Sequence, residues 1–200
     1  MAEEYKFLIT GYGRSGTGYM AAWFGYMGYD IGHERFKKDG ISAWQFAVPD
    51  AKCGAGAREG KTFKHVIHVV RNPWKVLRSN LYRRNIKPTY NFCKKWGDIE
   101  REGELESEMR SVVIWNRLAA EQNPDLTVRV EDVPEKVPEW MKANGIPVNY
   151  KVGPPNKEVN KCNTEMKPLP GEILKGVGGE SAEMFKAHCE LYGYPVEQDG

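Results

Sequence analysis

The stretch FLITGYGRSGTGYM, residues 7–20, decides the fold of this 200-residue chain. Its first residues complete an apolar and aromatic run that begins at Tyr5 and is typical of a buried strand. Glycines follow at once, and the apolar spacing from Gly16 onward is compatible with a helix. A glycine-rich turn between a strand and a helix presents backbone N–H groups and the positive end of the helix dipole to an anion. The stretch therefore predicts a strand–loop–helix unit with an anion site in its loop.

This loop differs at one important position from loops that bind nucleoside triphosphates. Those loops follow the pattern G-x-x-x-x-G-K-[ST], in which the lysine contacts the β- and γ-phosphates. With Gly11 and Gly16 aligned on the two glycines, Thr17 stands where the lysine belongs. Arg14 lies inside the turn and supplies a forked donor that suits an oxyanion. We expect the loop to bind a phosphate-like group without a γ-phosphate.

Strand patterns alternate with helix patterns along the rest of the chain. The run KHVIHVV, residues 64–70, predicts a second buried strand, and Asn72 then caps a helix with Pro73 in its first turn. Residues 104–123 predict a long amphipathic helix, and residues 126–133 predict a third strand. This alternation favours an α/β fold with a central parallel β-sheet flanked by helices.

One domain is expected over residues 1–200, because 40% hydrophobic content is enough for an ordinary core. A terminal helix is predicted over residues 181–196. Residues 146–179 are rich in Pro, Gly, Asn and Lys without periodicity, which predicts a loop or flap within the domain. Three lysines in this segment suggest that it closes over an anionic ligand, with an exposed linker as the alternative; they are Lys157, Lys161 and Lys167.

Charge is balanced overall and unevenly placed along the chain. The chain has 29 Lys and Arg against 27 Asp and Glu, a net charge of +2, which argues against a surface that binds polyanions everywhere. Residues 61–96 nevertheless hold ten Lys or Arg and no acidic residue. This block surrounds the exit of the second predicted strand, where α/β sheets bind ligands, although a solvated basic face is the alternative.

The cysteines and the apolar runs indicate the compartment. The four cysteines are widely spaced without a C-x-x-C pair, as expected of free thiols in a reducing compartment. The sequence has no basic-then-apolar leader, and no apolar run approaches the roughly 20 residues that span a bilayer. We expect a cytoplasmic protein without a membrane partner.

A second motif, RNPWKVLRS, places Arg71 at the exit of the second strand and Ser79 eight residues later in the following helix. Together with GRSGT, it resembles the sulfotransferases that use 3′-phosphoadenosine 5′-phosphosulfate (PAPS), a family with a P-loop NTPase-like architecture. VRVEDV and the closing LYGYP are also similar to segments of that family. The resemblance implies that Arg71 and Ser79 hold the 3′-phosphate.

The resemblance also implies that the loop holds the 5′-phosphosulfate of PAPS. The residues concerned are Gly13, Arg14, Ser15, Gly16, Thr17 and Gly18. Gly18 departs from the family pattern, which has Thr or Ser there, so one hydroxyl donor to the 5′-phosphate is missing. The length of the chain leaves little room for an elaborate acceptor pocket, so the expected acceptor is a small molecule or an extended molecule such as a glycan, and no nucleic-acid partner is expected.

Sulfuryl transfer needs cations at the leaving phosphate and a base at the acceptor. Arg14 and the loop amides suit the first role. The family's base is a histidine shortly before the RNP strand or a glutamate after the second strand. Residues 48–64 contain no histidine, so the chain resembles the glutamate branch, with Glu34 as the expected base. His33 is the alternative base, and a solvated His-Glu turn with no catalytic role is the third possibility.

Two other functions are compatible with parts of this sequence. A P-loop kinase acting on a small molecule is the rival enzyme, and the missing lysine counts against it. A non-catalytic polyanion-binding module built on the basic block would need neither the loop nor the Arg71 and Ser79 pair. No metal is expected, because the donor carries no triphosphate and the sequence has no clustered ligand set.

Overall fold

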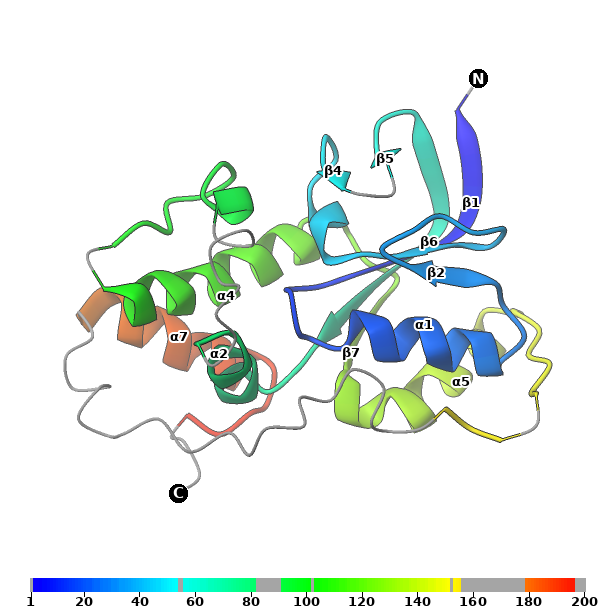
Figure 1. Cartoon of the computed structure of the whole chain (residues 1–200). Helices are drawn as coiled ribbons and strands as arrows, with labels where there is room; N and C mark the ends of the chain where they lie inside the picture. The colour runs from blue at the N-terminus through cyan, green and yellow to red at the C-terminus, as the bar shows by residue number, and fades with distance from the viewer. Residues whose placement is uncertain are drawn as a thin grey trace. The chain divides into compact units, whose positions relative to one another are not determined.

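The computed structural model describes residues 2–53, 56–81, 91–101, 103–151, 153–155 and 179–196. The predicted flap lysines Lys157, Lys161 and Lys167 lie outside these residues. Figure 1 shows the elements in chain order. The strands are β1 (Glu3–Thr10), β2 (Ile31–His33), β3 (Gly40–Ser42), β4 (Lys52–Cys53), β5 (Gly56–Ala57), β6 (Lys61–Val70) and β7 (Leu126–Arg129). The α-helices are α1 (Thr17–Tyr26), α2 (Pro73–Leu81), α4 (Glu104–Ala120), α5 (Val133–Ala143) and α7 (Gly179–Leu191).

The chain divides into two compact units, each made of two stretches of sequence. Unit 1 comprises Met1–Val70 and Leu118–Lys161, and unit 2 comprises Arg71–Arg117 and Cys162–Gly200. The glycine-rich loop and the His33–Glu34 segment belong to unit 1, whereas Arg71 and Ser79 belong to unit 2. A single domain over residues 1–200 stays a prediction.

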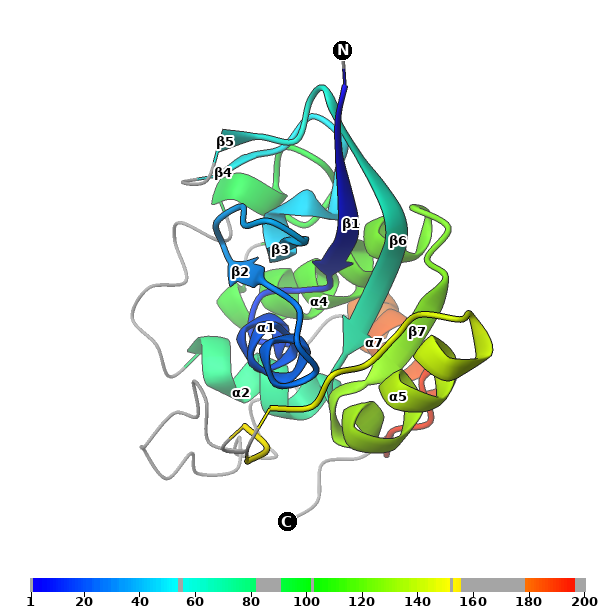
Figure 2. The same cartoon turned by 90° about the vertical axis from the view of Figure 1, so that its right-hand side faces the viewer.

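Unit 1 is built on a five-stranded sheet in the order β2-β3-β1-β6-β7, in which all neighbouring strands are parallel. The two long strands β1 and β6 run side by side in its middle, as Figure 2 shows. The predicted α/β fold with a central parallel sheet flanked by helices is confirmed, and the arrangement is compatible with a P-loop-like architecture. The third predicted strand is shorter than expected, because the chain turns into a 3-10 helix at Val130–Asp132.

Helices α1 and α5 cover one face of this sheet, and their apolar side chains form its core. Phe7 of β1 meets Phe24 of α1 and Tyr29 edge-on, with ring centroids 5.0 Å apart in both pairs. Val137 and Met141 of α5 are completely buried in the same cluster. This packing holds the N-terminus of α1 at the edge where the parallel strands end.

In unit 2, α2 begins where the sequence predicts. The Asn72 side chain accepts hydrogen bonds from the backbone N–H of Trp74 and Lys75, at 3.0 and 3.3 Å, which caps the helix. Trp74 then packs edge-on against Phe185 of α7, with ring centroids 4.8 Å apart. The apolar face expected for this helix is therefore buried in the unit.

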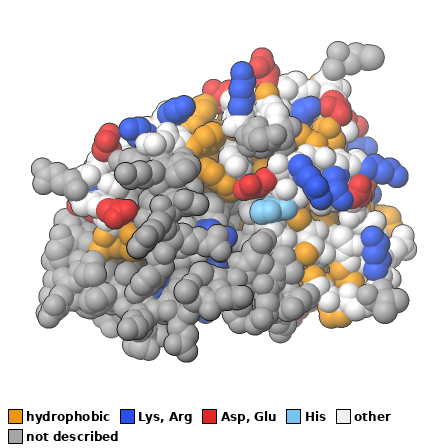
Figure 3. All heavy atoms as spheres, in the orientation of Figure 1, with side chains coloured by type: hydrophobic (Ala, Val, Ile, Leu, Met, Phe, Trp, Pro, Cys, Tyr) orange, Lys and Arg blue, Asp and Glu red, His pale blue; other side chains and the backbone are white. Residues whose placement is uncertain are grey.

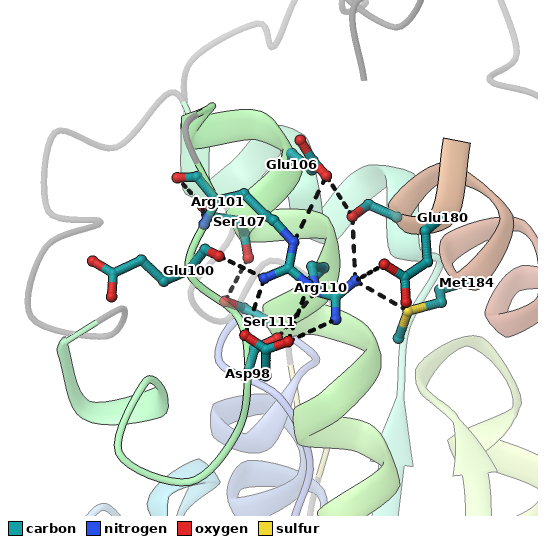
Figure 4. Close-up of polar contacts among 10 residues, drawn as sticks. Asp98, Glu100, Arg101, Glu106, Ser107, Arg110, Ser111, Glu180 and Met184 are labelled. Atoms are coloured by element: carbon teal, nitrogen blue, oxygen red, sulfur yellow. Dashed lines mark hydrogen bonds and ion pairs between the residues drawn. The ribbon is translucent and has the colours of Figure 1, made fainter. Parts of the chain in front are cut away.

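Arg110 of α4 is a buried cation that joins three segments of unit 2, as Figure 4 shows. Its guanidinium donates to the Asp98 carbonyl at 3.0 Å and lies 3.4 Å from the Asp98 carboxylate. It also lies 3.3 Å from the Glu180 carboxylate and 3.5 Å from both Ser181 Oγ and Met184 Sδ on α7. A planar guanidinium can hold all these acceptors at once, which fixes α7 on α4.

Replacing Arg110 by Ala is expected to lower the free energy of unfolding by about 1.5–3 kcal/mol, the usual loss for charged hydrogen bonds. The loss should stay below the ~3–5 kcal/mol of a broken, fully buried pair, because the Asp98 and Glu180 side chains are about three-quarters exposed and regain water. Urea unfolding of the full chain measures it. Lys186→Ala, which removes an exposed pair with Glu183 on α7, is the control and should change stability by less than about 0.5 kcal/mol. Equal losses in the two variants would contradict a structural role for Arg110.

Candidate functional site

The loop after β1 adopts a backbone suited to an oxyanion. A Cβ on Gly11 would lie 2.2 Å from the Val69 carbonyl oxygen of β6, so only glycine lets the loop leave the sheet there. Arg14 and Gly16 are both in the left-handed region, with φ of 73° and 104°. Left-handed residues within a turn direct neighbouring N–H groups into a common concavity, which is a known anion-binding geometry.

Two features of this loop have polar groups to offer a ligand. No side-chain hydrogen bond caps α1, and its first turn contains no acidic residue. The positive end of the helix dipole is therefore not offset locally. Within the described residues, the Ser15 hydroxyl is buried and has no hydrogen-bond partner. Such a group costs roughly 1–3 kcal/mol, and an oxyanion held by the loop would accept its hydrogen bond.

Thr17, the first residue of α1, contacts both segments that flank the loop in the sheet. Its hydroxyl oxygen lies 3.3 Å from His33 Nε2 at the end of β2. Its carbonyl accepts a hydrogen bond of 2.7 Å from the completely buried Ser42 hydroxyl of β3. The Ser42 carbonyl in turn accepts the backbone N–H of Glu34 at 2.9 Å. Ser42 thus ties the His33–Glu34 turn to the start of α1.

Glu34 and His33 stand at the same edge of the sheet as the loop, as the parallel strand order requires. His33 is the register partner of Ser42, and Glu34 follows it with φ of 53°, in the left-handed region. A non-glycine residue in that conformation stores about 1–3 kcal/mol of strain and is maintained by surrounding structure. The geometry of unit 1 therefore brings Arg14, Thr17, His33 and Glu34 into one neighbourhood.

The pKa of His33 is lowered from its ordinary value. Desolvation by burial is the main cause, the Glu34 carboxylate opposes it, and the Arg14 cation adds to it. Because a lowered histidine pKa favours the uncharged ring, His33 is neutral at pH 7. A neutral ring nitrogen can accept the hydrogen bond of the Thr17 hydroxyl.

The proposed 3′-phosphate residues lie in unit 2. Arg71 directly follows the last residue of β6 and is half-buried. Ser79 is buried in the middle of α2, while Lys75, expected on the same polar face, is exposed. The expectation of one open polar face on this helix is therefore wrong for Ser79, whose position is packed inside the unit.

Part of the basic block is neutralised by the neighbouring strand. Lys61 pairs with Glu3 at 2.7 Å and Lys64 with Glu4 at 3.8 Å, because β1 and β6 align these residues in register. Figure 3 shows acidic and basic side chains intermixed among the coloured atoms of the face drawn. This mixture weakens the case for a polyanion-binding surface.

Other groups in the described segments offer no alternative centre of chemistry. No three His, Cys, Asp or Glu residues among them are placed to hold a metal ion. Burial raises the pKa of the Cys93 thiol well above its usual range and that of Cys189 to about 12, so both stay protonated at neutral pH. A hollow of about 550 Å³ at the end of α5, lined by residues such as Pro138, Lys142 and Tyr150, includes none of the loop residues.

No helix in the described segments is both long and apolar enough to cross a bilayer. Two site features were absent from the sequence-based prediction. One is Ser42, and the other is the contact between Thr17 and His33. A single serine in a three-residue strand carries no pattern of its own, so neither feature could be found before the strand order was known.

Comparison with known proteins gives one partial similarity. No family model and no solved structure matches the chain. Over 124 aligned residues the chain is 30% identical to the A-type component of the glutamyl-tRNA(Gln) amidotransferase of Afipia carboxidovorans, an alignment that takes in 56% of this chain. The chain spans only 24% of the length of that protein. The similarity therefore assigns the chain to no family.

Proposed function

We propose that this protein is a sulfotransferase that moves a sulfuryl group from PAPS to a hydroxyl or amine of a small-molecule or glycan acceptor. The observation that carries the proposal is the loop between β1 and α1. It combines left-handed backbone at Arg14 and Gly16, an uncapped helix N-terminus and the unpartnered, buried Ser15 hydroxyl. These groups suit a phosphosulfate, and Thr17 stands where a triphosphate-binding loop has its lysine.

The proposal gives each residue one part of the transfer. The acceptor oxygen bonds to sulfur as the bond between sulfur and the 5′-phosphate oxygen breaks, and that oxygen keeps the electron pair. Arg14 and the loop N–H groups stabilise the charge that develops on it. Glu34 takes the acceptor proton, and Arg71 and Ser79 contact the 3′-phosphate. A cytoplasmic location, where PAPS and free thiols coexist, belongs to the same proposal.

Titration calorimetry with the full chain tests the nucleotide class. We expect 3′-phosphoadenosine 5′-phosphate (PAP) to bind in EDTA as tightly as in magnesium, because cations and N–H groups of the protein neutralise its phosphates. ATP with magnesium is expected to bind at least about 10-fold more weakly, since no lysine meets its γ-phosphate. Tighter binding of ATP, lost in EDTA, would indicate the small-molecule kinase instead. Equal, salt-sensitive binding of all polyanions would indicate the non-catalytic binding module.

A further inference from the structure

The contact between Thr17 and His33 is built into the fold of unit 1. Thr17 is 4% exposed, and its hydroxyl oxygen lies 3.3 Å from His33 Nε2. Ser42 holds both partners, because its hydroxyl binds the Thr17 carbonyl at 2.7 Å and its backbone is the register partner of His33. The two side chains therefore meet through backbone that is fixed on both sides.

The direction of this hydrogen bond depends on the charge of the imidazole. With the proton on Nδ1, the neutral ring accepts at Nε2, and the Thr17 hydroxyl hydrogen points to His33. The hydroxyl then presents only lone pairs to the anion loop. A protonated ring donates from both nitrogens, so Nε2–H donates to the Thr17 oxygen. The hydroxyl hydrogen is then released to donate to an anion.

We infer that His33 is a positioning residue that controls anion binding through Thr17: the loop binds a doubly charged oxyanion more tightly when His33 is protonated. The inference rests on the proposed function, because it concerns the same loop. It gives His33 a role different from that of a general base. A histidine that binds in this way leaves Glu34 as the proton acceptor.

The other charges at this position set the sign of the effect. Arg14 from the loop after β1 and Glu34 from the turn after β2 are the charged groups that act on the ring, and they oppose one another. The pKa of His33 is lowered without a ligand, and a bound anion raises it by linkage. Affinity should therefore increase as pH falls through the pKa of the complex, and level off below that of the unliganded protein, which is under about 6.5.

Inorganic sulfate is a suitable probe, because it keeps its double charge across this pH range while a phosphate ester titrates. We expect sulfate to bind about 10-fold more tightly near pH 5 than near pH 8, a typical coupling for two linked sites. The backbone amide NMR signals of Ser15 and Gly16 report its binding, and the His33 ring signal reports protonation. Saturating sulfate should raise the His33 pKa by about one unit, which is the same factor of ten.

Variants separate this role from a structural one. His33→Gln keeps an amide donor at every pH and should bind sulfate with a flat pH profile. Thr17→Val removes the hydroxyl and should leave less than about a third of the logarithmic change, due to charge alone. His65→Gln, which replaces a half-buried histidine of β6, should keep the full profile and is the control.

Each outcome bears on one claim only. Sulfate that shifts the loop amides with the same affinity at both pH values would overturn the His33 inference and leave the proposed function intact. The same holds if His33→Gln keeps the wild-type pH profile. If sulfate shifts no loop amide at any pH, the anion site is wrong, and the proposed function falls with it.

Discussion

Glu34→Gln is expected to lower the turnover of PAPS by about 10²–10⁴-fold, the usual contribution of a general base. The amide keeps the size of the side chain and its hydrogen bonds but cannot take the acceptor proton. The backbone should tolerate the change, because the left-handed conformation of Glu34 is maintained by its N–H bond to Ser42 and not by the carboxylate. Conversion of PAPS to PAP in the presence of a panel of hydroxyl and amine acceptors measures the effect.

The affinity for PAP should barely change in the same variant, which separates a lost base from a damaged site. Glu59→Gln, at an exposed position before β6, is the matched control and should retain wild-type turnover. If Glu34→Gln turns over normally while His33→Ala abolishes the reaction with nucleotide still bound, the base is His33. That result would also remove the positioning role inferred for His33.

Arg71→Ala is expected to weaken the binding of PAP roughly 10- to 150-fold, equivalent to one charged hydrogen bond of about 1.5–3 kcal/mol. Adenosine 5′-phosphate lacks the 3′-phosphate, so its affinity should change little. Calorimetry with both ligands makes the comparison, and Lys75→Ala, which removes an exposed cation from α2, controls for a general loss of positive charge. Equal losses for the two nucleotides would show that Arg71 does not recognise the 3′-phosphate.

Local patterns in the sequence were sufficient for the fold class. The β1–loop–α1 unit and the capped start of α2 both follow from short-range signals, namely an apolar run, a glycine turn and an Asn-Pro pair. Alternation of strands and helices then requires parallel pairing, which the sheet shows. Loop residues that suit an anion were likewise visible, because glycines and a basic residue in a strand–helix turn are local features.

Only the tertiary structure decided how that loop is completed. The three-residue strands β2 and β3 are too short to show periodicity, and β3 enters the sheet between β2 and β1, an order no local pattern encodes. That order aligns His33 with Ser42 and brings both to Thr17, from positions 16 and 25 residues away in the chain. The burial of the Ser15 hydroxyl and of Arg110 is decided in the same way, since burial depends on which distant segments pack around a residue. Sequence therefore determined which groups are available for an anion, and long-range strand pairing determined which of them meet.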